Sequence, residues 1–321
     1  MIVVTGALGF IGSCLISKLN ELGHEVILAV DDFYKDRKDP NLEEKQIREW
    51  VHRDIFLSFL NTSWSNIDFV FHLGARTDTT EKDKAIFDHL NFNYSKRIWE
   101  ICTARQLPLI YASSAATYGL GEYGFKDDHD VVEKLEPLNP YGVSKNDCDA
   151  WALKQEETPP FWAGLKFFNV YGPNEYHKGR MASVIFHTFH QIRKTGGMKL
   201  FRSHRKDFKD GEQSRDFIYV KDLLEVCIWL MENKPESGLY NLGTGKARSF
   251  FDLAANTFKA LGVKENISYI DTPEDIRDTY QYFTEADMSK LKRAGYKKKM
   301  HSLEDGIEDY VKEYLMKGRY Y

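Results

Sequence analysis

The stretch Gly6-Ala-Leu-Gly9-Phe-Ile-Gly12 decides the fold of this chain. It follows a short apolar run at residues 2–4 and opens an amphipathic segment, which is the order strand, turn, helix. Glycines suit this turn because the chain must turn tightly, let a pyrophosphate approach bare backbone and pack the helix on the strand. Asp31 ends the next apolar run, where a ribose hydroxyl needs an acceptor. Together these features predict a dinucleotide-binding unit rather than an ordinary turn.

Short apolar runs alternate with longer amphipathic segments through the first half of the chain. The runs at residues 26–30, 69–72 and 109–112 have the length and composition of buried strands. Strands that alternate with helices form a parallel, doubly wound sheet. We therefore expect a Rossmann-type α/β fold.

The composition of the sequence changes after Tyr171-Gly-Pro, where segments without regular periodicity and rich in aromatic and basic residues begin. Residues 216–231 again have the pattern of a strand followed by a helix, and we expect this strand to return to the sheet. A smaller, interleaved C-terminal substrate domain is therefore predicted. The expected bounds are 1–168 with a returning segment at about 216–235 for the dinucleotide-binding domain, and 169–215 with 236–321 for the substrate-binding domain.

Composition narrows the possible partners. The 321 residues carry a formal net charge of -4, which provides no basic field for nucleic acid. The chain begins without a basic segment or cleavage site, and no run of about 18 apolar residues occurs, so we expect a cytoplasmic protein without membrane attachment. The cysteines are scattered and form no C-x-x-C pair, which predicts buried thiols and neither disulfides nor a metal site: Cys14, Cys102, Cys148 and Cys227.

Tyr141-Gly-Val-Ser-Lys145 places a phenol and an ammonium on one face of a helix. A lysine there favours the phenolate of a tyrosine whose ordinary pKa is about 10, so Tyr141 can act as acid or base. Upstream, Ser114 lies near the end of the apolar run at 109–112 and can hydrogen-bond a substrate alcohol. Each motif alone also fits a plain structural role, but the glycine loop, Ser114 and the Tyr/Lys pair in this order predict hydride chemistry.

Further motifs carry a resemblance to a known family. The chain contains GALGFIG, FHLGA, YASSAATYG, PYGVSK and FFNVYGP, in that order. This series resembles the extended short-chain dehydrogenase/reductase family, whose members remodel nucleotide-linked sugars. RTDTTE at 76–81, HKGRMASVIFH at 177–187, RDFIYV at 215–220 and YQYFTEAD at 280–287 are similar to the epimerases of ADP-activated heptoses within that family. The resemblance runs almost from end to end.

The resemblance implies roles for individual residues. It implies that Tyr141 and Lys178 are the two acid/base groups, that Lys145 orients the ribose and tunes the tyrosine, and that Ser114 supports the sugar. Beside the glycines of the loop (Gly6, Gly9 and Gly12), it implies cofactor contacts at Phe10, Ile11, Asp31, Asp32, Lys38, Arg53, Leu73, Gly74, Ala75, Asn91, Lys145 and Val170. It places substrate near Ser114, Asn169, His187, Phe201, Arg215 and Tyr280, and we add Arg180, which departs from the family pattern.

The implied reaction is epimerisation at C6 of ADP-D-glycero-D-manno-heptose, giving the L-glycero epimer for lipopolysaccharide core synthesis. Inverting an unactivated carbinol carbon requires removal and return of its hydride, so one base on each face would serve the two epimers. That need explains Lys178 in addition to Tyr141; from the residues alone, Lys178 reads rather as a cation for the diphosphate. The family resemblance also implies a homo-oligomer.

The form of the cofactor stays open between NADP and NAD. Asp31 and Asp32 would repel a 2'-phosphate, whereas the neighbouring basic residues Lys35, Arg37, Lys38 and Arg53 would attract it. NADP is expected, with NAD possible. Asp32 stands where an asparagine is frequent in the family, which weakens the preference.

Three other functions compete with this reading. A UDP-hexose 4-epimerase shares all motifs except those at 177–187 and 280–287. A sugar-nucleotide dehydratase would need an Asp-Glu pair where this chain has Ala115-Ala116. A dinucleotide-binding sensor without chemistry would be expected to lack the tyrosine or the lysine, and both are present.

Overall fold

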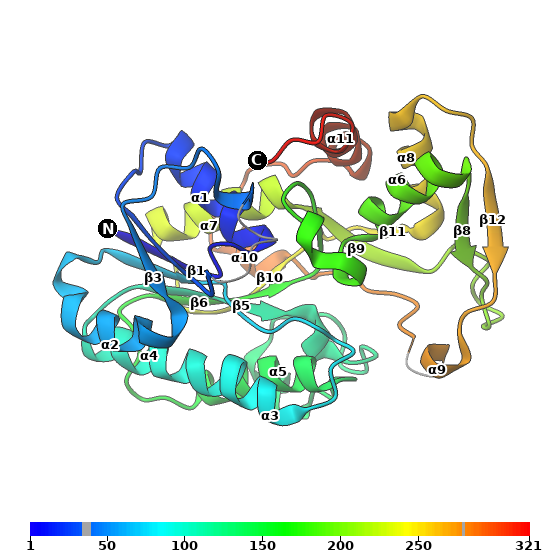
Figure 1. The fold of residues 1–321 in the computed structure, drawn as a ribbon. Coiled ribbons are helices and arrows are strands. Elements are labelled where there is room, and N and C mark those ends of the chain that lie inside the picture. The colour runs from blue at the N-terminus through cyan, green and yellow to red at the C-terminus, as the bar shows by residue number, and fades with distance from the viewer. Residues whose placement is uncertain (34–39, 278–279) are drawn as a thin grey trace.

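The computed structural model describes residues 1–33, 40–277 and 280–321. Its centre is a seven-stranded, all-parallel sheet in the order β10-β6-β5-β4-β1-β2-β3 (Figure 1). The strands are β1 (Ile2–Thr5), β2 (Ile27–Asp31), β3 (Glu49–His52), β4 (Phe69–His72), β5 (Leu109–Ser114), β6 (Trp162–Phe167) and β10 (Gly238–Leu242). The predicted doubly wound α/β fold is confirmed.

Helices cover both faces of this sheet (Figure 1). One face carries α1 (Phe10–Glu21) and α7 (Val220–Asn233); the other carries α2 (Arg53–Ser63), α3 (Lys84–Phe87), α4 (Tyr94–Ala104) and α5 (Pro140–Leu153). Successive strand residues enter different cores, since Val3 packs in one hydrophobic cluster and Val4 in the other. Burial on both faces explains why these strands are continuous apolar runs. All four cysteines are buried and free, as predicted.

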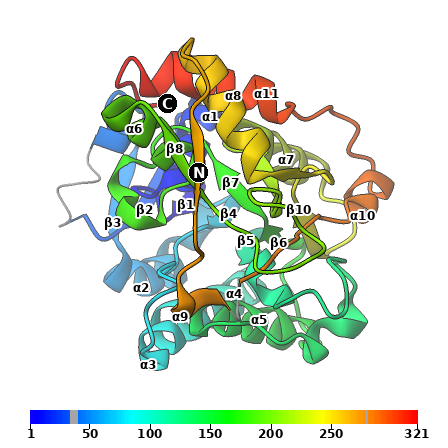
Figure 2. The ribbon, with the colours of Figure 1, turned by 90° about the vertical axis from the view of Figure 1, so that its right-hand side faces the viewer.

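A second lobe is built from short elements of the C-terminal half (Figures 1 and 2). Its sheets are β7 (Asn169–Tyr171), β9 (Ser214–Tyr219) and β11 (Ala247–Ser249), and β8 (Met198–Phe201) with β12 (Ile267–Ile270). Its helices include α6 (Val184–Thr195), α8 (Phe250–Leu261) and α9 (Glu274–Arg277), and the chain closes with α10 (Ser289–Arg293) and α11 (Leu303–Asp309). Short turns of helix are η2 (Trp64–Asn66), η3 (Asp88–Asn93), η4 (Ala115–Tyr118), η5 (His129–Lys134), η6 (Tyr176–Met181) and η7 (Tyr310–Leu315).

The chain returns to the main sheet later than the sequence predicts. The strand expected at residue 216 is β9, which pairs with β7 on one side and β11 on the other. Both edges of β9 are therefore occupied, and it cannot join the seven-stranded sheet. The helix α7 does return and contacts α1, and β10 supplies the strand beside β6. The exact domain bounds stay a prediction. In the described part of the chain, no helix combines the length and apolar character needed to cross a membrane.

Candidate active site

The parallel register brings the ends of several strands to one edge of the sheet. Thr5 pairs with Val30 and with His72, and Ser114 pairs with Phe167. The segments that follow these strands therefore emerge together: the glycine loop after β1, Asp31 in β2, residues 73–75 after β4, Ser114 in β5, and Asn169 and Val170 after β6. In doubly wound sheets, ligands bind at this edge.

The glycine loop has room only for hydrogen at two positions. Gly6 has φ +69, and a Cβ there would lie 2.7 Å from Cα of Gly74. A Cβ on Gly12 would lie 2.1 Å from the carbonyl oxygen of Gly6. No side chain caps the start of α1 at Gly9, and Phe10 and Ile11 form its first turn. The bare backbone and uncapped amides fit a dinucleotide pyrophosphate.

Asp31 braces this loop as well as ending β2. Its Oδ2 accepts a hydrogen bond from Leu8 N at 2.9 Å, and its Oδ1 accepts one from Asp32 N at 2.8 Å. Arg53, at the start of α2, lies 3.4 Å from the Asp32 carboxylate, and its buried Nε has no hydrogen-bond partner within residues 1–33, 40–277 and 280–321. The predicted cofactor residue Lys38 lies outside the described residues.

The segment after β4 is tied to the loop from the other side. The Thr5 hydroxyl accepts from Gly74 N at 3.1 Å and lies 2.7 Å from Nδ1 of His72. Leu73 and Ala75 flank Gly74 and are half-buried. Asn91, which is fully buried, bonds both backbone groups of Arg76 and the Ser144 hydroxyl. The structure therefore gives Asn91 a bracing role, and its contact with a cofactor stays a prediction.

Tyr141 and Lys145 lie in the first turns of α5, whose start is capped by the Asn139 side chain. Burial raises the pKa of Tyr141, and the hydroxyl of Ser114, which hydrogen-bonds it, lowers that pKa. Lys145 is 3% exposed and donates to the carbonyl of Ala112 at 2.8 Å. The nearby group that favours the phenolate is thus Ser114, and a direct effect of Lys145 on Tyr141 stays a prediction.

Lys178 lies in η6, against the start of α1. Its Nζ is 5.3 Å from the centre of the Phe10 ring. Burial lowers the pKa of Lys178, and the carboxylate of Glu175 raises it. Glu175 is fully buried and accepts from the hydroxyls of Ser183 at 2.6 Å and Tyr310 at 2.9 Å. A partly desolvated ammonium is thereby held beside the glycine loop.

Two loops meet next to Lys178. The exposed Arg180 guanidinium lies 3.4 Å from the carboxylate of Asp78, and Arg76 lies 3.6 Å from the same side chain. The exposed His187 at the start of α6 lies 3.3 Å from the carbonyl of Arg180. The RTDTTE and HKGRMASVIFH motifs, far apart in sequence, are therefore adjacent in the fold.

Three predicted substrate residues form a cluster in the second lobe. The Arg215 guanidinium lies 5.4 Å from the Tyr280 ring, and Phe201 contacts the same ring at 6.0 Å between centres. Burial lowers the pKa of Arg215; burial raises the pKa of Tyr280 while Arg215 lowers it. Arg215 donates to the carbonyls of Ser214 and Gln281, which fixes its orientation. Aromatic rings around a fixed cation suit a base and a diphosphate.

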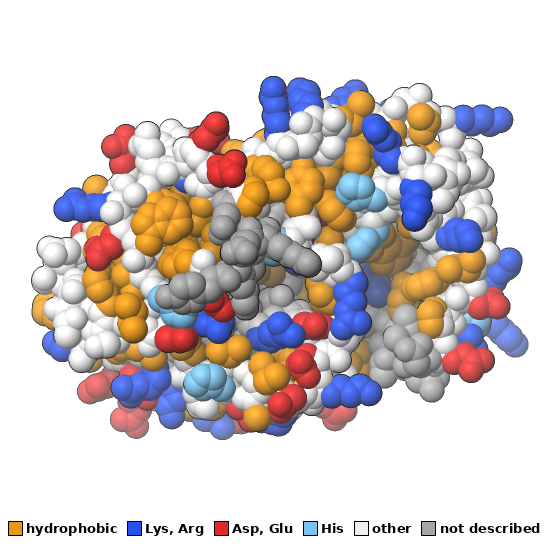
Figure 3. Space-filling view, in the orientation of Figure 1, with side chains coloured by type: hydrophobic (Ala, Val, Ile, Leu, Met, Phe, Trp, Pro, Cys, Tyr) orange, Lys and Arg blue, Asp and Glu red, His pale blue; other side chains and the backbone are white. Residues whose placement is uncertain are grey.

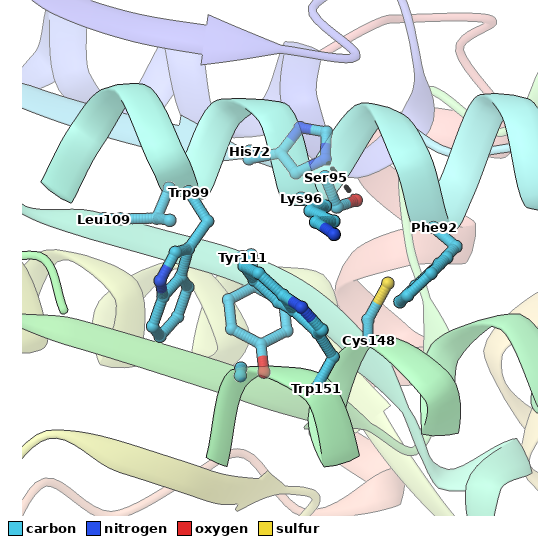
Figure 4. Close-up of a pocket in the computed structure, with 10 residues that line it drawn as sticks. His72, Phe92, Ser95, Lys96, Trp99, Leu109, Tyr111, Cys148 and Trp151 are labelled. Atoms are coloured by element: carbon cyan, nitrogen blue, oxygen red, sulfur yellow. Dashed lines mark hydrogen bonds between the residues drawn. The ribbon is translucent and has the colours of Figure 1, made fainter. Parts of the chain in front are cut away.

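The surface is hollowed between the two lobes, and Lys, Arg and His side chains gather along its margin (Figure 3). A small pocket of about 20 Å³ lies between α4, α5 and β5, with His72, Trp99 and Cys148 in its lining (Figure 4). That volume holds about one water and excludes a nucleotide sugar. No group of His, Cys, Asp or Glu among the described residues could hold a metal ion.

Sequence reasoning missed several residues around the site. The Glu175 carboxylate raises the pKa of Lys178, and Thr5, which contacts His72, hydrogen-bonds the backbone of Gly74 beside the glycine loop. Asp149, about one helical turn beyond Lys145 on α5, forms a buried ion pair with Lys166. Asp149 could have been found, because it follows Lys145 by four residues on the same helical face.

A family model described as the NAD dependent epimerase/dehydratase family matches residues 2–243. The chain belongs to this family. Members of the epimerase/dehydratase family use a nicotinamide dinucleotide, which agrees with the uncapped helix and crowded glycines at residues 6–12. The family resemblance predicted from the motifs is confirmed.

Named relatives narrow the comparison. The ADP-L-glycero-D-manno-heptose-6-epimerase of Fusobacterium nucleatum is 48% identical to this family member over 327 residues, covering 99% of this chain and 98% of the relative. The crystal structure of the Helicobacter pylori enzyme of the same name has a TM-score of 0.79 at 27% identity, covering 97% and 95% of the two chains. A UDP-N-acetylglucosamine 4-epimerase from Methanobrevibacter ruminantium has a TM-score of 0.81 at 23% identity, covering 98% of each chain, and shows the fold alone.

Proposed function

We propose that this protein inverts C6 of ADP-D-glycero-D-manno-heptose to give the L-glycero epimer. One observation carries the proposal: the chain is 48% identical, over nearly the whole of both chains, to the ADP-L-glycero-D-manno-heptose-6-epimerase of Fusobacterium nucleatum. The site supports it with two groups that can move protons, Tyr141 beside Ser114 and Lys178 beside the glycine loop.

The chain's own residues divide the work. A nicotinamide dinucleotide held at the glycine loop would accept the hydride from the sugar carbon and return it. Tyr141, hydrogen-bonded to Ser114, takes and returns the proton of the sugar hydroxyl in one orientation of the sugar. Lys178, whose pKa is lowered by burial, does the same for the other orientation. Arg215, fixed by backbone carbonyls, binds the diphosphate.

NADP is our proposed cofactor. The 2'-phosphate would have to lie near Asp32, whose negative charge opposes it. Arg53 lies 3.4 Å from that carboxylate and offsets the charge, and its guanidinium, on a side chain that is 36% exposed, can donate to a phosphate oxygen. A comparison of NADPH and NADH affinities tests this choice.

The wider setting follows from the substrate. The product would feed lipopolysaccharide core synthesis, and the family resemblance favours a homo-oligomer. Activated sugars and reduced dinucleotides are cytoplasmic metabolites, so we propose that the enzyme acts there. Light scattering of the purified protein tests the oligomer.

Proton NMR of the purified protein with ADP-D-glycero-D-manno-heptose and no added reductant tests the reaction. Appearance of the L-glycero epimer would establish both the substrate and a redox-neutral mechanism. Conversion of UDP-galactose to UDP-glucose, with the heptose unchanged even after NADP is added, would refute the substrate and the role of Lys178.

A further inference from the structure

Asp149 is a buried carboxylate that the proposed acid/base scheme does not use. It is 0% exposed and lies on α5, four residues after Lys145 and eight after Tyr141. Positions with this spacing share one helical face. Its Oδ2 lies 2.7 Å from Nζ of Lys166, which is 1% exposed and belongs to β6. A complete ion pair is therefore buried about one helical turn beyond Lys145 on α5.

The carboxylate also binds the strand that carries Ser114. Asp149 Oδ1 accepts from the Tyr111 hydroxyl at 3.0 Å, and Oδ2 accepts from the Ser113 hydroxyl at 2.7 Å. Between them, the Ala112 carbonyl accepts from Lys145. Residues 111–113 of β5 are thus each held by α5, and the strand ends at Ser114. This geometry fixes the distance between helix and strand where Tyr141 and Ser114 meet.

Lys166 is held in turn by neutral groups. It donates to the Thr117 hydroxyl at 2.8 Å, and its Nζ lies 5.0 Å from the centre of the Tyr118 ring, both in η4. Burial raises the pKa of Tyr118 well above its ordinary value. Lys166 is therefore held by Asp149 and by Thr117, and it is the direct ion-pair partner of Asp149.

Asp149 acts on the charges of the catalytic groups. Burial lowers the pKa of Lys145, while Cys148 and then Asp149 raise it. Burial raises the pKa of Tyr141, Ser114 lowers it, and Asp149 raises it.

Among the described residues, three neighbouring titratable groups carry no charge near neutral pH: His72, Cys148 and Tyr111. Burial lowers the pKa of His72 to about 3 and raises that of Cys148 to about 12, and burial raises the pKa of Tyr111 well above its ordinary value. Asp149 is therefore the carboxylate that sets the field at both Lys145 and Tyr141.

We propose that Asp149, held by Lys166, is a positioning residue for the reaction. It aligns α5 with the end of β5 so that Tyr141 meets Ser114, and its negative charge favours the protonated form of the buried Lys145. The inference rests on the proposed function only in taking Tyr141 and Lys145 as working groups of the site.

The test compares Asp149→Asn with the double variant Asp149→Asn/Lys166→Met. The double variant removes Lys166 together with its ion-pair partner, so it keeps the test valid if the single variant does not fold. Losing Asp149 removes an influence that raises two pKa values, so both fall. We expect the limb of the kcat/KM pH profile that reports Tyr141 to move to lower pH, by roughly one unit. Asp216→Asn, which removes a buried carboxylate of the second lobe, is the matched control and should leave that limb in place.

Dinucleotide binding gives a readout that needs no sugar substrate. NADPH affinity, measured by fluorescence titration at a series of pH values, should decrease as the pH rises and Lys145 loses its proton. In both Asp149 variants we expect this decrease to begin at a lower pH than in the wild type. If the wild type fails to epimerise the heptose, the proposed function falls, and this titration still decides the role of Asp149. Folded variants with an unmoved limb and unmoved binding, whatever their kcat, would overturn the proposal.

Discussion

Replacing Gly12 with alanine perturbs the dinucleotide site where its geometry is tightest. A Cβ at position 12 would lie 2.1 Å from the Gly6 carbonyl oxygen and 3.2 Å from Cα of Ala7. Contacts of a Cβ below 3.0 Å are essentially never found, so Gly6 and the start of α1 must separate by about 0.9 Å. Because the obstacle is backbone rather than a flexible side chain, rotation cannot relieve it.

The displacement moves the amides that are to face the pyrophosphate. A misplacement of about 1 Å in a binding group can cost about 100-fold, so we expect the Kd for NADPH to rise about 100-fold, which corresponds to about 2.8 kcal/mol. Forcing an extra methyl into a packed region also costs about 1–3 kcal/mol of folding stability. Fluorescence titration with NADPH measures the first effect, and the Tm measures the second.

Gly306→Ala is the matched control for crowding. Gly306 also lies inside a helix, α11, and a Cβ there would lie 2.1 Å from the Tyr171 hydroxyl oxygen. It should lower the Tm and leave NADPH affinity within a few-fold of the wild type. A folded Gly12→Ala protein that binds NADPH as tightly as the wild type would refute the placement of the pyrophosphate on this loop.

Three further substitutions test the acid/base and substrate groups. Tyr141→Phe should lower kcat at least about 100-fold in single-turnover assays while NADPH binding is kept; unchanged turnover would remove Tyr141 from the mechanism. Glu175→Gln removes the carboxylate that raises the Lys178 pKa, so Lys178 should lose its proton at a lower pH. The basic limb of the pH–rate profile should then shift to lower pH, and a limb that stays in place would show that it does not report Lys178. Arg215→Lys should raise KM for the nucleotide sugar about 10-fold with a smaller change in kcat, and steady-state kinetics showing an equal KM would exclude the diphosphate contact.

Strands β1, β2, β4 and β5 could be predicted because burial on both faces makes each one a continuous apolar run. Strand β6 could not be predicted in this way, since Gly164 and Lys166 interrupt its apolar run. Edge strand β3 could not, since Val51 is its only buried residue and the pattern is too short to read. The strand at residue 216 was assigned to the wrong sheet for a different reason. A strand followed by a helix has the same local pattern whichever sheet it joins, and only the pairing of β9 with β7 and β11 decides the matter.

The candidate site shows the same division between local and long-range information. Tyr141 and Lys145 could be found because their spacing follows one helix. Arg215 contacts Tyr280, which lies 65 positions further along the chain, and only the family resemblance predicts that both belong to the site. Asp149 could be found from its spacing to Lys145, but its pairing with Lys166 joins a helix to a strand, and no local pattern predicts that partner. Buried polar partners are specified by the tertiary fold, which a local pattern does not encode.

The two lobes brace their working groups in different ways, and this bears on how specificity can change. In the first lobe, Tyr141 lies on α5, and Asp149 of the same helix hydrogen-bonds Tyr111 and Ser113 of β5. A substitution at this contact between α5 and β5 would therefore also alter the hydride chemistry. In the second lobe, Lys178 depends on Glu175, which is held by Ser183 before α6 and by Tyr310 in η7. These supports lie outside the main sheet. Substitutions in the second lobe can therefore move Lys178 and the substrate contacts while the dinucleotide site stays intact, which allows one fold to serve different nucleotide sugars.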